Sequence, residues 1–415
     1  MTSMSGVDTQ VASVARRGRL GSGFWAVAFA FLIVMSFATL PSPLYGLYRT
    51  RDHLSAFMIT VVFAIFAVGT ISTLLGERFI VARVGRRGAV LGGVAVMMVA
   101  AGLLAVWKGL PGLLIGRLLT GVAVGLAAGV AIPYLIELRV RVDPSAASSA
   151  FARNVGTSVN VGALGIGPLV AGCLAQWAPA PLTLPYLVLV ALGAVALIGV
   201  AAAPETGTPA PRSTAAGGPA RSRRPVRLPA PAATATIAAF AATGLFAGLS
   251  GLLLAATLHQ SSHALAGATL FLVYSAGVAS QLATTRLGAS RVLALGSIFM
   301  VVGLALLVIA VRLSAPSLAL FLIGGALIGA GAGAIYKGTT GLVLQATEPE
   351  DRVVMTSLLV IAVFVGISVP VIGAGVALDQ GAAASDTVLV FAILVALGVL
   401  VSGLVLLRRQ PSDTR

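Results

Sequence analysis

The sequence has very little charge. Asp, Glu, Lys and Arg make up 9% of the 415 residues, whereas a soluble domain carries roughly 25%. Hydrophobic residues make up 58%, and the mean hydropathy is +1.03. So few charges cannot cover a water-exposed surface of this size, which excludes an ordinary soluble protein. The apolar excess predicts a protein embedded in a lipid bilayer.

Cysteine is almost absent, and no catalytic motif stands out. The single cysteine, Cys173, lies in an apolar run, so an intrachain disulfide or a thiolate metal cluster is excluded. We find no phosphate-binding glycine loop, no nucleophile motif, and no cluster of acids or histidines. The sequence therefore predicts neither an enzyme nor a cofactor or metal site.

The basic residues do not indicate nucleic-acid binding. The net charge is +15, but the arginines lie in short gaps between apolar runs, and basic patches interleaved with aromatic residues are missing. Such gaps set the orientation of membrane spans, because positive charge is retained in the cytoplasm. Gaps expected to be cytoplasmic hold most of the arginines, with Arg83, Arg86 and Arg87 among them.

Twelve apolar runs are long enough to cross a membrane as helices, which needs about 20 residues each. They are too long and too continuously apolar for the strands of a barrel. The predicted spans are 24–48, 56–76, 88–107, 111–135, 151–173, 184–203, 234–258, 263–283, 291–312, 317–341, 354–378 and 387–407.

The chain divides into two halves of six spans. Residues 24–203 and 234–407 are the predicted halves, and a basic, Pro- and Ala-rich linker at 204–233 joins them. We expect the tails 1–23 and 408–415, like the linker, to be cytoplasmic. The expected location is the cytoplasmic (plasma) membrane, as a multi-pass protein in contact with lipid.

The two halves repeat in sequence. At a shift of 208 residues, Gly121 aligns with Gly329 and Gly165 aligns with Gly373. Glycine is common in this sequence, so single matches carry little weight. The same shift of 208 residues, however, aligns residues across two spans and the loop that joins them. Parallel six-span repeats place a substrate site at the interface of the halves, near the middle of the membrane.

Three segments resemble one family. The gap after the second span reads Ala82-Arg83-Val84-Gly85-Arg86-Arg87, and the fourth span contains Arg117, Thr120, Gly121 and Gly125. The fifth span reads Gly165-Ile166-Gly167-Pro168, followed by Gly172. Together these segments resemble the Major Facilitator Superfamily, and the last resembles the antiporter signature of its drug–proton exporters. The resemblance implies an all-α fold of twelve transmembrane helices in two pseudo-symmetric halves.

The first motif departs from the family pattern, because Arg78 stands where a glycine and Ala82 where an aspartate is usual. The missing acid usually helps to latch the cytoplasmic side, so the resemblance carries over only Arg83, Gly85, Arg86 and Arg87 as gating residues. The same arginines could simply fix the topology.

Arg117 is the strongest single candidate for transport or coupling. It lies about 9 Å along a helix that begins near Pro111, where a charge is costly and should face the interior. The family uses this arginine near the transport path and in proton coupling. Gly121 and Gly125 form a small-residue stripe on its face, and Gly165, Gly167 and Pro168 are typical of close helix approach and a bend.

Acidic side chains are missing from the middle of every predicted span. The coupling candidates at span ends are therefore Glu137 and Asp52, and Lys337 could contact an anionic substrate, pair with Glu137 or extend to the interface. Polar residues that could line the central cavity are Thr39, Tyr45, Thr120, Asn154, Asn160, Gln281 and Tyr336.

We interpret the chain as a monomeric secondary transporter that works by alternating access. Proton-coupled export of a small lipophilic or neutral compound is the first expectation. Uptake of a sugar or other metabolite is the alternative, although Trp25, Trp107 and Trp177 lie at span ends rather than where they could stack on a sugar. A membrane-embedded enzyme, or a receptor with the same fold that does not transport, are two further alternative interpretations.

Overall fold

The computed structural model describes residues 4–206 and 227–408, with the side chains of residues 4–19, 78 and 353 left out. Every regular element in these ranges is helical. The first half contains α1 (Met4–Thr39), η1 (Ser42–Leu44), α2 (Tyr45–Asp52), α3 (Ala56–Val106), α4 (Leu110–Ala128), α5 (Ala131–Val142), α6 (Ala146–Trp177) and α7 (Leu184–Ala202). The second contains α8 (Ala230–Ala256), α9 (His263–Ala283), α10 (Ala289–Arg312), α11 (Leu318–Gln345), η2 (Pro349–Asp351), α12 (Arg352–Asp379) and α13 (Ala384–Arg408).

The twelve predicted spans are confirmed, because each overlaps one of the twelve helical segments of the described residues that are long and apolar enough to cross a membrane. The details differ in three places. Helix α1 starts at Met4, well before the predicted span. Helix α3 contains both the second and the third span, joined through a kink at Gly85. The predicted fourth span is divided into α4 and α5 at Gly129 and Val130.

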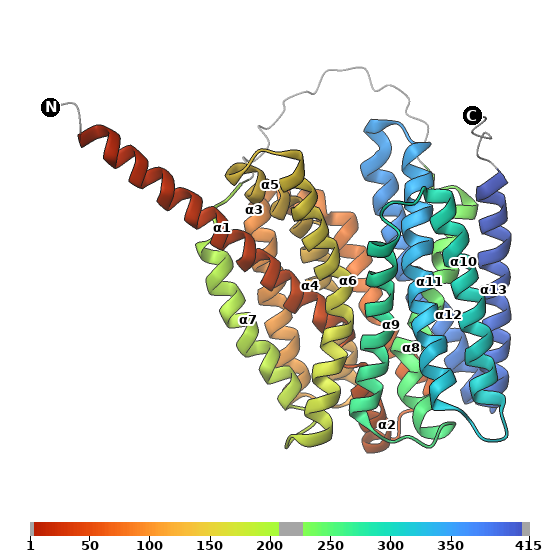
Figure 1. Ribbon diagram of the computed structural model, residues 1–415. Coiled ribbons are helices and arrows are strands. Elements are labelled where there is room, and N and C mark those ends of the chain that lie inside the picture. The colour runs from red at the N-terminus through yellow and green to blue at the C-terminus, as the bar shows by residue number, and fades with distance from the viewer. Residues whose placement is uncertain (1–3, 207–226, 409–415) are drawn as a thin grey trace.

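The kink at Gly85 explains how one helix can contain two antiparallel spans. Gly85 has φ 72° and ψ 177°, a conformation that glycine adopts without a steric penalty. The chain therefore reverses direction there without a long loop. The arginines that follow Gly85 lie at the same end of the bundle as residues 206 and 227 (Figure 1). We call this end the linker end and the opposite end, where α2 lies, the α2 end.

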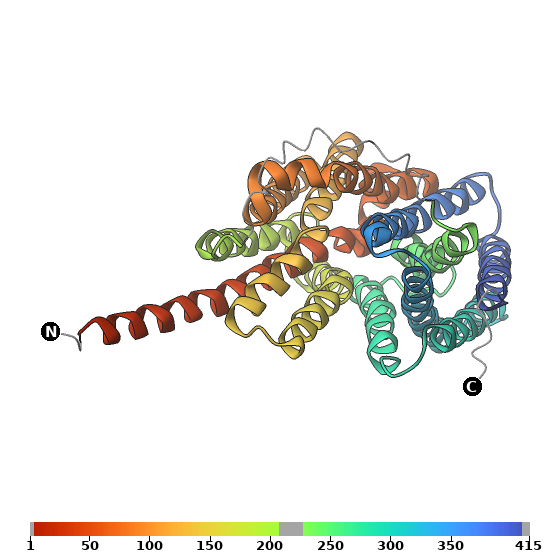
Figure 2. The same cartoon turned by 90° about the horizontal axis from the view of Figure 1, so that it is seen from above.

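Two helical bundles lie side by side (Figure 1), formed by α1–α7 and α8–α13. Viewed from above, the bundles meet along two pairs of helices (Figure 2), with α6 packed on α9 and α3 packed on α12. The pairs are equivalent under the internal repeat, because the fifth span contacts the eighth and the eleventh contacts the second.

The repeat also appears in the packing within each half. A Cβ at Gly121 would lie 1.9 Å from the carbonyl oxygen of Phe66, so α4 and the second span touch backbone to backbone. A Cβ at Gly329 would lie 1.9 Å from the carbonyl oxygen of Val273, so α11 and α9 touch in the same way. Small residues allow this close approach inside a membrane. The glycines that align at a shift of 208 residues therefore make the same kind of backbone contact in each half.

Candidate functional site

Arg117 is completely buried and is the largest fully buried side chain among the described residues. Its guanidinium donates to the carbonyl oxygen of Ala38 at 2.8 Å and to that of Phe63 at 3.4 Å. It also lies over the Phe66 ring, 4.7 Å from the centroid. No carboxylate in the described part of the chain forms an ion pair with it. Two carbonyls and an aromatic face thus replace the acid that a buried cation usually needs.

The carbonyl of Ala38 is available because the first span breaks beside it. Helix α1 ends at Thr39, and Pro41 and Pro43 follow. Proline has no backbone N–H and cannot continue the helical hydrogen bonds. The last carbonyls of α1 therefore lack intrahelical donors, and the arginine of the fourth span binds one of them. The proline pair and Arg117, far apart in the sequence, form one structural unit.

A second proline acts in the same way in the fifth span. Pro168 lies inside α6 and cannot donate to the carbonyl of Leu164, four residues earlier. The hydroxyl of Thr39 donates to this carbonyl at 2.7 Å. Thr39, which we predicted as a cavity-lining residue, is buried at 3% exposure in this structure, where its hydroxyl completes the backbone hydrogen bonding of α6.

Thr120, another predicted cavity residue, likewise has a local hydrogen-bond partner. It is fully buried and donates to the carbonyl of Gly116, one turn earlier in α4. Tyr45 is buried as well, but its hydroxyl and the Nε of Arg117 have no hydrogen-bond partner among the described residues. Nearby, the hydroxyls of Tyr48 and Tyr186 lie 3.2 Å apart. The interior around Arg117 thus contains two polar atoms that remain free to bind water or a ligand.

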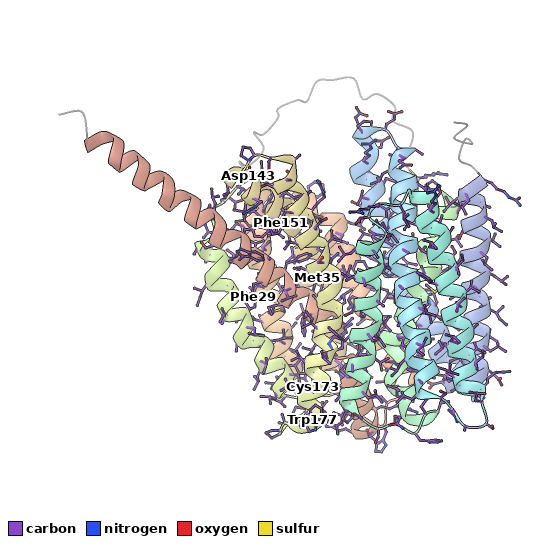
Figure 3. All side chains as sticks on the ribbon, in the orientation of Figure 1. Phe29, Met35, Asp143, Phe151, Cys173 and Trp177 are labelled. Carbon is purple, nitrogen blue, oxygen red and sulfur yellow. The ribbon has the colours of Figure 1, made fainter. Side chains whose placement is uncertain are left out.

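The two halves are in close contact over about two helical turns at the α2 end. Cβ atoms at Gly165, Gly172 and Gly267 would all meet backbone atoms of the helix from the other half, at 3.1, 2.4 and 2.3 Å. Cys173 and Trp177 mark this end of α6 in Figure 3, and Asp143 and Phe151 lie toward the linker end. These glycines therefore form the tightest described contact between α6 and α9.

Helices α3 and α12 close the α2 end on the other side of the interface. The Asp379 carboxylate at the end of α12 lies against the Ser55 hydroxyl and the backbone of Ala56 and Phe57, at the start of α3. An anion at a helix N-terminus interacts favourably with the free N–H groups and the helix dipole. Further inside, the rings of Phe66 and Phe364 lie 5.8 Å apart, edge to face. The aromatic ring that covers Arg117 therefore also contacts the opposite half.

At the linker end, α6 and α9 separate (Figure 1). Continuing the contact face of α6 by steps of three and four residues from Gly165 leads to Asn154, which is exposed. The corresponding face of α9 leads to Leu282, which is 50% exposed. Three amide side chains lack a hydrogen-bond partner among the described residues: Asn154, Asn160 and Gln281. The Tyr336 ring packs edge to face on Phe240, with the ring centroids 5.6 Å apart.

A cluster of charged groups holds the linker end of the first half together. Arg86 forms an ion pair with Glu137 at 2.9 Å, and the same carboxylate accepts a hydrogen bond from Thr206 at 2.6 Å. The backbone N–H of Arg87 donates to Glu205 at 3.2 Å. Glu137 is therefore part of a structural network formed by the motif loop, α5 and the chain after α7.

Glu205 contacts the motif loop, a role that the sequence analysis did not predict. A Cβ at Gly85 would lie 3.0 Å from its carboxylate, so an acid from beyond the sixth span lies against the loop whose own acid is replaced by Ala82. Tyr134 and Arg141 secure the same segment through the carbonyls of Pro204 and Glu205. The available signal was an acid that follows the sixth span after a single proline, Pro204.

Three remaining candidates have local partners. Lys337 donates to the carbonyl oxygen of Gln281 at 2.5 Å and to the Thr284 hydroxyl at 3.3 Å, so it caps the end of α9 rather than pairing with Glu137. A cation is favourable at a helix C-terminus. Asp52 lies 3.6 Å from Arg51 at the α2 end. Arg83 is exposed on the motif loop.

Comparison with known proteins supports this arrangement. A family model described as "Sugar (and other) transporter" matches residues 22–176, most of the first half. The crystal structure of the nucleoside transporter NupG is similar with a TM-score of 0.70, over 92% of this chain and 98% of that chain, at 10% sequence identity. The chain has the Major Facilitator fold.

The predicted fold class, twelve helices in two pseudo-symmetric halves, is therefore confirmed. At 10% identity the likeness to NupG establishes the fold alone. No curated protein matches the sequence. Both matches that we describe are transporters rather than enzymes, which agrees with the absence of a catalytic motif. Neither is described as a drug–proton exporter, so that finer resemblance stays a prediction.

Proposed function

We propose that the chain is a secondary transporter that moves a small uncharged molecule between its two halves by alternating access. The observation that carries this proposal is the asymmetry of the interface. The halves touch backbone to backbone at Gly165, Gly172 and Gly267, while the ribbons of the same two helices diverge toward the linker end (Figure 1). This asymmetry supports a state that is closed at the α2 end and whose opening would lie at the linker end.

The composition of the path supports an uncharged substrate. Among the described residues Arg117 is the one fully buried cation, and two carbonyls and an aromatic ring already contact its guanidinium, which leaves only its Nε without a partner. The acids of the described spans lie at span ends, in local contacts such as Arg86–Glu137. A multiply charged substrate would find no opposite charge to replace its hydration, whereas the free amides suit hydroxyl or carbonyl groups.

We favour proton-coupled export as the direction and energy source, supported by the likeness of the Gly165–Gly172 segment to the exporter signature. In this proposal the proton acts on a gate. Protonation of Glu137 would remove the partner of Arg86 and loosen the linker end, and Asp52 is the corresponding candidate at the α2 end. We further propose that the linker end is cytoplasmic, in the plasma membrane, and that a monomer suffices because each chain contains both halves.

Uptake of a sugar or another neutral metabolite is the second candidate. The observation that favours it is that three amide side chains of the two contacting helices, Asn154, Asn160 and Gln281, have no hydrogen-bond partner among the described residues. Sugar hydroxyls are matched by such groups. The sugar-transporter family model and the nucleoside transporter with the same fold add support by analogy.

Flux measurements in proteoliposomes test both candidates. The purified protein is reconstituted with an imposed pH gradient of either sign, and lipophilic dyes, sugars and nucleosides are followed in both directions. Proton-coupled export predicts dye movement against the proton gradient, which an uncoupler abolishes; the second candidate predicts accumulation of a polar metabolite. Asn154→Ala and Gln281→Ala should lower metabolite flux, and Gln345→Ala, an exposed amide in α11, is the matched control. Absence of flux for every compound with folded protein would refute the proposal.

A further inference from the structure

The second half contains a groove that the transport path does not use. It has a volume of about 640 Å³ and lies between α12 and α13, with α8 as its floor. Its lining is almost entirely apolar, and Val390 and Leu394 on its rim are 56% and 65% exposed. These residues belong to a membrane span, so the groove opens toward the lipid.

The floor of the groove separates it from the interface between the halves. A Cβ at Gly244 would lie 2.3 Å from the carbonyl oxygen of Ile367, and a Cβ at Gly366 would lie 2.5 Å from that of Ile237. Helices α8 and α12 are therefore in backbone contact, and no side chain or ligand fits between them. An occupant of the groove must enter from the membrane and not from the central path.

One polar atom in the groove has no partner. Thr387 lines it and is 8% exposed, and its hydroxyl makes no hydrogen bond with the described residues. A buried hydroxyl without a partner is costly. Thr387 lies one turn inside the α2 end of α13, near one end of a helix long enough to cross the membrane. The ester carbonyl of a glycerolipid would accept the hydrogen bond that this hydroxyl can donate.

The dimensions and charge also fit a lipid. From Asp386 to Gly398 the groove follows twelve residues of α13, about 18 Å of helix, close to the ~15 Å hydrocarbon depth of one leaflet. At the mouth, the Arg312 guanidinium contacts Asp386 and is 42% exposed. Arginine has five N–H donors, so it can bind a phosphate while it keeps this contact.

We propose that this groove is a binding site for one membrane phospholipid, with an acyl chain between α12 and α13, its ester carbonyl on Thr387 and its phosphate at Arg312. The bound chain fills a space that would otherwise separate α13 from α12. The site does not depend on the transported substrate or on the direction of transport.

Native mass spectrometry of the full-length protein tests the site. The protein is reconstituted in nanodiscs of phosphatidylethanolamine and phosphatidylglycerol, extracted, and washed with detergent, and the retained phospholipid per chain is counted. The wild type should retain one. Gly373→Leu places a side chain in the groove, where nothing lies within 4 Å of a Cβ, and should abolish retention. Thr387→Val should weaken it about fivefold, the effect of losing one hydrogen bond.

Gly102→Leu is the matched control, because Gly102 also has nothing within 4 Å of a Cβ and lies in α3 of the other half. It should retain lipid like the wild type. Equal retention in all four proteins would overturn the site. A mass of two chains that reverts to one in Gly373→Leu would also overturn it, because a second copy would then be the occupant. If Gly373→Leu does not fold, Thr387→Val decides alone.

Discussion

Replacing Arg117 separates its structural role from its role in transport. Its hydrogen bonds to the carbonyls of Ala38 and Phe63 contribute about 1.5–3 kcal/mol each, and the contact with the Phe66 ring about 2 kcal/mol. Against this stands the desolvation of a completely buried guanidinium, which costs several kcal/mol. Because these contributions nearly cancel, a side chain of similar length without charge should fit at little net cost.

We therefore expect Arg117→Met to lower the free energy of unfolding by less than about 2 kcal/mol. Both variants leave the Ala38 carbonyl without its side-chain donor, but Arg117→Ala also leaves an empty volume and should cost about 3–5 kcal/mol. Both should abolish flux. Thermal unfolding in detergent and proteoliposome flux are measured on the same preparations, with Arg286→Met as a control for the loss of a positive charge at an exposed position. Normal flux in folded Arg117→Met would show that the arginine serves packing alone.

Three further predictions follow from the described contacts. Asp379→Ala should weaken the closure of the α2 end, so that Cys173, beside the contact residue Gly172, reacts faster with a maleimide; an unchanged rate would argue against this closure. Gly121→Ala should destabilise the protein by about 1–3 kcal/mol because its Cβ would meet the Phe66 carbonyl, while Gly373→Ala, which meets nothing, should be neutral in the same melting assay. Hydrogen bonds from the Ser148 and Ser145 hydroxyls lower the pKa of Asp143, so its stabilising effect is present above the unfolded pKa near 3.8 and is lost as pH falls through the lower folded value. The difference in melting temperature between wild type and Asp143→Asn should accordingly persist at pH 6 and vanish at strongly acid pH; a constant difference would contradict this.

The span pattern could be predicted from the sequence because the bilayer imposes it. A run of about 20 apolar residues is a strong signal, and glycines at repeat-related positions such as Gly121 and Gly329 indicated two matched halves. The exact breaks were harder. The division between α4 and α5 at Gly129 involves no proline. The side chain of Glu77 occupies the space beside Gly129, and the local sequence around Gly129 does not predict this contact.

The roles of polar side chains were the least predictable part of the site. The sequence does not distinguish a threonine that faces a cavity from one that donates to a nearby carbonyl. Thr39 and Thr120 both donate to carbonyl oxygens beside them. The partner of Thr39 exists only because Pro168 frees the carbonyl of Leu164 on another helix. Glu205 and Asp379 are isolated acids in sequence, and their positions follow from the packing of distant spans.

Distances between spin labels at the two ends of the interface test alternating access most directly and require no knowledge of the substrate. In a Cys173→Ser background, one pair is placed at Arg153 and Leu282 near the linker end, and the other at Thr50 and Gln380 near the α2 end; all four positions are exposed. The account predicts two distance populations for each pair, such that conditions that shorten one pair lengthen the other. A single unchanging distance at both ends, under every pH gradient and candidate substrate, would contradict it.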